Sequence, residues 1–126
     1  MSTILAFDVG TKRTGVAVAF AGTNIAVAKD TIVHASLSDL HSSIVALCAM
    51  HRTHTIVLGL PLLPSGKEGA QARIVRDLAV ELQNTGIEAI YIDERYTTVR
   101  NAQYDGDASS ACHILSTFLD RTVPSH

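Results

Sequence analysis

Three acidic side chains stand at the ends of apolar segments of the chain. Asp8 follows the apolar run 4–7, Glu94 comes shortly after the apolar run 87–92, and Asp107 opens the last helical pattern. Carboxylates gathered at one place repel one another unless cations neutralise them, and their hard oxygens suit Mg²⁺ or Mn²⁺. We therefore interpret these three residues as candidate catalytic residues and metal ligands.

Carboxylates of this kind can support phosphodiester hydrolysis. Two divalent ions held ~3.5–4 Å apart activate a water and stabilise the leaving oxygen. In that arrangement Asp8 would bridge both ions, while Glu94 and Asp107 would each hold one. Two other interpretations stay open: Asp8 could be a surface residue that opens a turn, and Asp107 could be a simple helix N-cap. We expect Asp93 to be structural, because alternation along a strand points it away from Glu94.

Four basic residues in the expected loops are candidates for nucleic-acid binding. Lys12 and Arg13 lie between Gly10 and Gly15, and Lys67 and Arg95 occupy two later loops. Their charges could contact the phosphates of a substrate backbone. The glycine-bounded turn matches neither the dinucleotide-binding pattern nor the Walker pattern, so it is a weak phosphate signal by itself.

The histidines and cysteines give little support to a site for a softer metal. His51 and His54 are three residues apart, but no carboxylate or cysteine is near them in sequence. Cys48 and Cys112 stand singly in apolar surroundings, which is typical of buried, reduced thiols.

Periodicity predicts five strands and four helices. The expected strands are apolar and partly β-branched, and they span residues 4–7, 16–20, 24–33, 55–60 and 87–92. The expected helices repeat apolar residues every three or four positions and span residues 36–50, 68–84, 97–104 and 107–121.

This order of elements predicts a particular sheet. Three strands in a row favour an antiparallel meander, and strands separated by helices favour parallel pairing. We therefore expect an α/β fold with a mixed five-stranded sheet and helices on both faces, which is the ribonuclease H-like layout. Parallel strands end at one edge, where ligands of such sheets usually bind, so Asp8 and Glu94 would meet there.

Composition limits the class of protein. The 126 residues fit one domain, 1–126, and 47% apolar with 17% charged residues is typical of a globular protein. A net charge of −2 argues against a broad basic coat, although a local basic patch is compatible with it. Since no run approaches ~18 apolar residues, we expect a soluble cytoplasmic protein without membrane partners.

Five stretches together resemble the YqgF (RuvX-like) family of pre-16S ribosomal RNA nucleases and Holliday junction resolvase homologues. They are DVGTKRTGVAVA from Asp8, GLP from Gly59, GKEGAQARIV from Gly66, DERYTT from Asp93 and DASSACHIL from Asp107. The resemblance covers nearly the whole chain and implies a ribonuclease H-like fold. It also implies catalysis by Asp8, Glu94 and Asp107 with a divalent metal.

The resemblance implies a hydrolase acting on structured RNA, such as the 5′ flank of the pre-16S ribosomal RNA, with ribosomal assembly particles as partners. Branched DNA is the alternative substrate, and the chain would act as a monomer or a homodimer. A different class is a non-catalytic nucleic-acid-binding module of the same fold. A nucleotide-binding protein of the actin or sugar-kinase type is disfavoured, because that architecture needs two such domains and 126 residues supply one.

Overall fold

The computed structural model of this chain describes residues 3–20, 22–93 and 106–122, and of residues 106–109 and 122 it describes the backbone only. Eight elements follow one another along these residues. In chain order they are β1 (Ile4–Asp8), β2 (Arg13–Ala19), β3 (Val27–Val33), α1 (Leu37–His51), β4 (Thr55–Leu60), α2 (Ala70–Asn84), β5 (Glu88–Asp93) and α3 (Gly106–Thr122).

The strands form one mixed sheet in the order β3-β2-β1-β4-β5. β2 pairs antiparallel with both β1 and β3, while β4 pairs parallel with both β1 and β5. The predicted meander and the predicted parallel part are both confirmed. As a result, β1, β4 and β5 end at the same edge of the sheet, and Asp8 is the last residue of the central strand β1.

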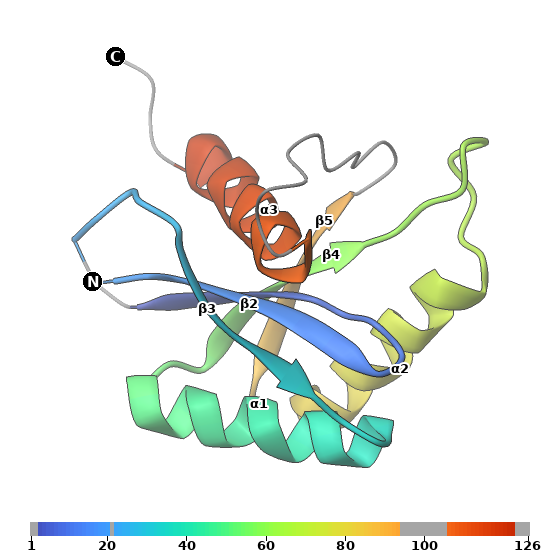
Figure 1. The fold of residues 1–126 in the computed structure, drawn as a ribbon, viewed down its shortest axis with the longest axis horizontal. Coiled ribbons are helices and arrows are strands. Elements are labelled where there is room, and N and C mark those ends of the chain that lie inside the picture. The colour runs from blue at the N-terminus through green and yellow to red at the C-terminus, as the bar shows by residue number, and fades with distance from the viewer. Residues whose placement is uncertain (1–2, 21, 94–105, 123–126) are drawn as a thin grey trace.

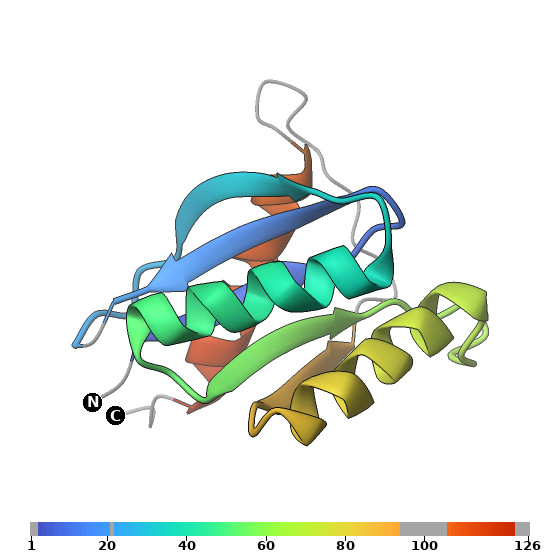
Figure 2. The ribbon, with the colours of Figure 1, turned by 90° about the horizontal axis from the view of Figure 1, so that it is seen from below.

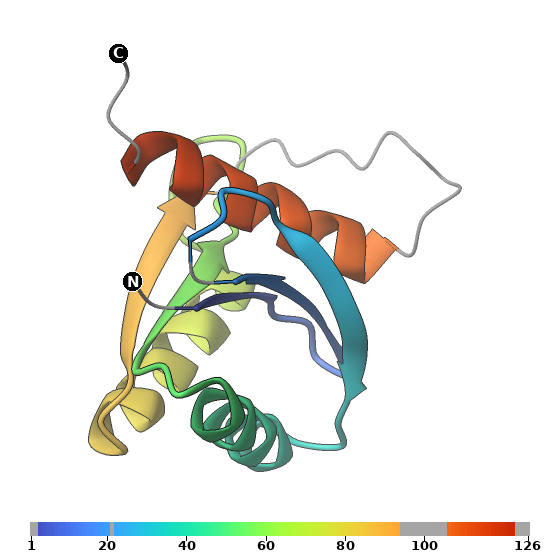
Figure 3. The same cartoon turned by 90° about the vertical axis from the view of Figure 1, so that its left-hand side faces the viewer.

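Helices cover both faces of the sheet, as expected. Figure 3 shows the strands between α3 on one side and α1 and α2 on the other, and Figure 1 shows the same layers from another direction. Figure 2, which looks at the molecule from below, shows α1 and α2 next to each other in front of the sheet. The core on their face is built from large aliphatic and aromatic side chains, among them Leu5, Phe7, Leu40, Ile44, Leu58 and Leu82.

The core beneath α3 is built differently, because much of it consists of alanine. Ala6, Ala17 and Ala19 of the sheet and Ala111 of α3 are at most 2% exposed and belong to one cluster. Small side chains allow a helix to lie close to the strands that it crosses. Ala111 and Ile114 lie on the sheet-facing side of this helix, and both are fully buried.

Three predicted boundaries differ from the structure by two residues or more. The second strand was expected from residue 16, but β2 begins at Arg13, which already pairs with β3. We expected the second helix to begin near Glu68, but α2 begins at Ala70, because Glu68 forms an isolated antiparallel bridge with Leu62. The third strand was expected from residue 24, and β3 begins at Val27, where its pairing with β2 starts.

The helix expected over residues 97–104 lies outside the described residues. Within the part of the chain that is described, no helix has the length and apolar character required to cross a membrane.

Candidate active site

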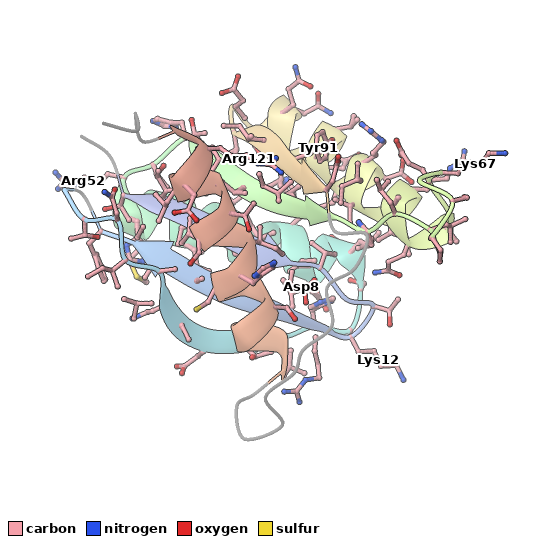
Figure 4. All side chains as sticks on the ribbon, turned by 90° about the horizontal axis from the view of Figure 1, so that it is seen from above. Asp8, Lys12, Arg52, Lys67, Tyr91 and Arg121 are labelled. Atoms are coloured by element: carbon pink, nitrogen blue, oxygen red, sulfur yellow. The ribbon has the colours of Figure 1, made fainter. Side chains whose placement is uncertain are left out.

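Asp8 lies at the carboxyl end of the central strand, on the face that α3 covers. Strand residues alternate between faces, so Asp8 shares the side of Ala6, which packs in the α3 cluster. Figure 4 shows Asp8 beside α3. Its partner across the antiparallel ladder is Gly15. On the other side, the parallel ladder with β4 ends at the pair Phe7–Leu58, and continuing its register by one residue sets Gly59 next to Asp8. Gly15 and Gly59, the neighbours of Asp8 on the two adjacent strands, carry no side chains.

The turn that follows Asp8 is held by a buried polar pair. The backbone N–H of Gly10 donates to Thr14 Oγ1 at 3.4 Å, and the same oxygen lies 2.9 Å from His34 Nε2. His34 also donates its backbone N–H to the Lys12 carbonyl at 2.9 Å. Thr14 is fully buried and His34 is 5% exposed, so this contact is shielded from water.

Sequence reasoning missed His34. Nothing near it in sequence indicates a partner, because its contacts lie 20 and 22 positions earlier in the chain. In the structure, His34 helps to hold the turn between β1 and β2. It directly follows β3, and because β3 pairs with β2, His34 lies beside Thr14. His34 Nδ1 is buried and has no partner among the described atoms.

The other two predicted acids directly follow the last residue of β5 and the first residue of α3 in the chain. Glu94 lies outside the described residues, one position after the end of β5. Asp107 is the second residue of α3, and its side chain is not described. Asp93 is exposed, as expected for a residue on the face opposite to that of the buried Ile92.

The four predicted basic residues differ in where the structure places them. Lys12 and Lys67 are exposed, and Figure 4 shows both pointing outward into solvent. Arg13 is the first residue of β2 and not a turn residue, because it pairs with Val33 of β3. The prediction for Arg95 falls outside the described residues.

The loop that carries Lys67 is anchored to α2 by an ion pair. Glu68 accepts two hydrogen bonds from Arg76, at 2.5 and 2.7 Å, and the Arg76 guanidinium lies 4.8 Å from the centre of the Tyr91 ring. The hydrogen bond from Arg76 lowers the pKa of Glu68. A lowered carboxyl pKa means that the pair contributes stability at neutral pH and loses it as the pH falls through the folded-state pKa.

The described residues fit a hard cation better than a soft one. Cys48 is buried and Cys112 is half-buried; neither is in a disulfide, and burial raises the pKa of Cys48 to about 11. A thiol with a raised pKa is a poor metal ligand at neutral pH because the thiolate is the binding form. Among the described side chains, no three from His, Cys, Asp and Glu come together. The glycine-flanked carboxylate of Asp8 is the donor that suits Mg²⁺ or Mn²⁺.

Comparison with known sequences shows relatives along the whole chain. The sequence model of the family described as "RuvX: Holliday junction resolvase" matches residues 2–121. A relative from Sulfurihydrogenibium sp. (strain YO3AOP1) is 35% identical, covering 96% of this chain and 92% of its own, and one from Polaromonas sp. (strain JS666 / ATCC BAA-500) is 33% identical, covering 98% and 91%. Both carry the name "Putative pre-16S rRNA nuclease".

Solved structures show the same fold at low sequence identity. Thermus thermophilus RuvC superposes with a TM-score of 0.65 at 10% identity, covering 94% of this chain and 95% of its own. The fowlpox virus resolvase in complex with Holliday junction DNA gives 0.60 at 11% identity, covering 97% and 99%. These neighbours confirm the ribonuclease H-like fold. The family model that matches residues 2–121 and the relatives at 35% and 33% identity show that the chain belongs to the RuvX family.

Proposed function

We propose that this chain is a metal-dependent nuclease that hydrolyses phosphodiester bonds, with the 5′ flank of pre-16S ribosomal RNA as its substrate. One observation carries the proposal: Asp8 ends the central strand on the α3 face, flanked by Gly15 and Gly59. The names of the relatives, pre-16S rRNA nuclease, support the choice of substrate.

We propose Asp8, Glu94 and Asp107 as the residues that hold the metal. Helical spacing supports Asp107, because it lies four and seven positions before Ala111 and Ile114, which pack on the sheet. When bound, one or two ions of Mg²⁺ or Mn²⁺ supply a nucleophile at neutral pH and neutralise the charge that develops during hydrolysis. The protein contributes a fixed set of carboxylates at the edge where β1, β4 and β5 end.

Basic residues around this edge would position the nucleic acid. We propose that Lys12, Arg13, Lys67 and Arg95 contact backbone phosphates. The outward direction of Lys12 and Lys67 supports contacts spread along an extended strand and argues against a single closed phosphate pocket (Figure 4). Such contacts orient the substrate but do not read its sequence.

Branched DNA is the second candidate substrate. The family is described as a Holliday junction resolvase, and the Thermus thermophilus RuvC structure with a Holliday junction superposes with a TM-score of 0.63. Cleavage of a four-way junction would need two cuts, so this function favours a homodimer. Action on ribosomal precursors favours association with assembly particles instead.

The substitution Asp8→Asn tests the proposal. A labelled pre-16S RNA and a synthetic four-way DNA junction are incubated with wild type and variant, each with Mn²⁺, Mg²⁺ or EDTA. We expect metal-dependent cleavage that falls by at least about 100-fold in the variant, beyond the ~10–100-fold typical of residues that only orient a metal ligand. Asp120→Asn, an exposed carboxylate of α3, makes the same charge change and should cleave normally.

The outcomes separate the hypotheses. Preferred cleavage of one nucleic acid decides between RNA and DNA. Equal activity of wild type and Asp8→Asn, or cleavage that persists in EDTA, would show that this site is not the nuclease centre. Binding of either nucleic acid without cleavage would favour the non-catalytic module.

A further inference from the structure

The Val9–Gly10 peptide, one residue beyond the peptide that follows Asp8, is held at both of its polar groups by side chains. Its carbonyl oxygen, that of Val9, accepts a hydrogen bond from Gln71 Nε2 at 3.0 Å. Its N–H, that of Gly10, donates to Thr14 Oγ1 at 3.4 Å. The carbonyl contact joins residues 62 positions apart, because Gln71 belongs to the first turn of α2.

This peptide lies where the sheet stops supporting the chain. The paired residues of β1 end at Asp8 with β2 and at Phe7 with β4, so no ladder partner fixes the backbone beyond them. If the Val9–Gly10 peptide turned, the Asp8–Val9 peptide that joins it to Asp8 would tilt. The Asp8 carboxylate would change direction with it, because the direction of a side chain follows the peptides on both sides of its Cα. The hydrogen bond from Gln71 of α2 constrains the Val9 carbonyl where no strand pairs with it.

Gln71 is well placed to be rigid. It is half-buried and adjoins Ala72, which is fully buried against the sheet, and the loop before α2 is anchored through Glu68 and Arg76. Holding a long amide side chain in one conformation costs conformational entropy, and an anchored helix turn lowers that cost. The bond is partly shielded from water, which strengthens it.

We propose that Gln71 is a positioning residue for Asp8: its side-chain amide holds the Val9–Gly10 peptide and thereby fixes the direction of the carboxylate that binds the metal. The proposal rests on the function proposed above. Gln71 contacts neither metal nor substrate in this role. Loss of a residue that orients a metal-binding side chain, without itself touching the metal, typically lowers metal affinity or activity by about 10–100-fold.

The test uses Gln71→Met, which keeps the length of the side chain and removes the donor. We expect Mn²⁺ affinity, measured by calorimetry without nucleic acid, to fall by about 10-fold or more, and kcat to fall with little change in KM. The amide resonance of Gly10 should shift, because its peptide loses one of two anchors. Gln83→Met, at an exposed glutamine of the same helix, is the matched control and should leave all of these values unchanged.

Urea unfolding of both variants separates positioning from a general loss of structure. Wild-type Mn²⁺ affinity and kcat in a folded Gln71→Met protein would overturn the positioning role, even if Asp8→Asn is inactive and the proposed function stands. Loss of activity only in proportion to the unfolded fraction would overturn it too. Absence of Mn²⁺ binding and of cleavage in wild type would instead reject the proposed function, and the positioning role with it.

Discussion

Gly10 and Gly86 are glycines for different reasons. At Gly10 there is no space for a side chain, whereas at Gly86 the backbone has a conformation that other residues rarely adopt. A Cβ at position 10 would collide with the backbone carbonyl oxygen of Arg13, which cannot move without opening the turn after Asp8. Gly86 differs, because its φ is 84° and a Cβ there would meet nothing within 4 Å. The first glycine permits a close approach of two backbone segments, and the second permits a left-handed residue after α2.

Replacing each glycine by alanine should therefore have different effects. Gly10→Ala is expected to lower the free energy of unfolding by about 1–3 kcal/mol and to reduce cleavage strongly, because the turn must shift. Gly86→Ala is expected to cost roughly 1–2 kcal/mol through its positive φ and to leave cleavage by the folded protein unchanged. Urea unfolding and initial cleavage rates measure both. Normal cleavage by a folded Gly10→Ala protein would contradict the assigned role of the turn.

At the scale of elements, α1 is the clearest case of local sequence setting a boundary. Ser36 is the N-cap, and its Oγ accepts from the N–H of Asp39 at 3.1 Å, while Asp39 Oδ2 accepts from the N–H of Ala35 at 3.3 Å. These reciprocal bonds resemble a capping box and satisfy backbone donors that a helix start leaves without partners. The N-cap of α1, Ser36, lies two residues after His34, so the loop that holds His34 leads directly into this helix.

Removal of the cap should destabilise the protein measurably. Ser36→Ala is expected to lower the free energy of unfolding by about 1 kcal/mol. Ser42→Ala, within the same helix at an exposed position, is expected to be neutral or slightly stabilising, because alanine has the higher helix propensity. Chemical denaturation of both variants provides the measurement. Equal stability changes would show that the Ser36 side chain is not what stabilises this helix end.

On the scale of the whole molecule, the close approach of α3 to the sheet connects the core to the candidate site. α3 crosses the strands and packs on alanines at positions 6, 17 and 19 (Figure 4). The same helix carries Asp107 in its first turn. Its distance from the sheet therefore determines how the two proposed metal ligands, Asp8 and Asp107, meet.

A larger side chain beneath α3 should disturb both stability and activity. Ala111→Leu is expected to cost about 1–3 kcal/mol, because overpacking a dense core forces the backbone to move. We also expect weaker Mn²⁺ binding in the folded variant, since α3 is displaced from the sheet. His113→Leu, at an exposed position of α3, serves as the control. Unchanged Mn²⁺ affinity in Ala111→Leu would separate α3 packing from metal binding.

The sequence alone determined the elements and the class of fold. Apolar periodicity located every described strand and helix to within about three residues, because each element buries a face whose pattern is local in the chain. Helices between the later strands required parallel pairing, which gave the mixed sheet. The sequence also predicted that Asp8 ends a strand and that Cys48 is a buried thiol, and the structure confirms both positions. The roles of Asp8, Glu94 and Asp107 remain predictions.

Only the tertiary structure decided how the site is framed. The contacts of Gln71 with Val9 and of His34 with Thr14 join residues 62 and 20 positions apart, and no local pattern encodes such pairs. The placement of Gly15 and Gly59 on either side of Asp8 depends on register between three strands. The physical reason is that hydrogen bonds between distant segments are specified by packing of the whole core, whereas strands and helices are specified by which face of a short segment avoids water.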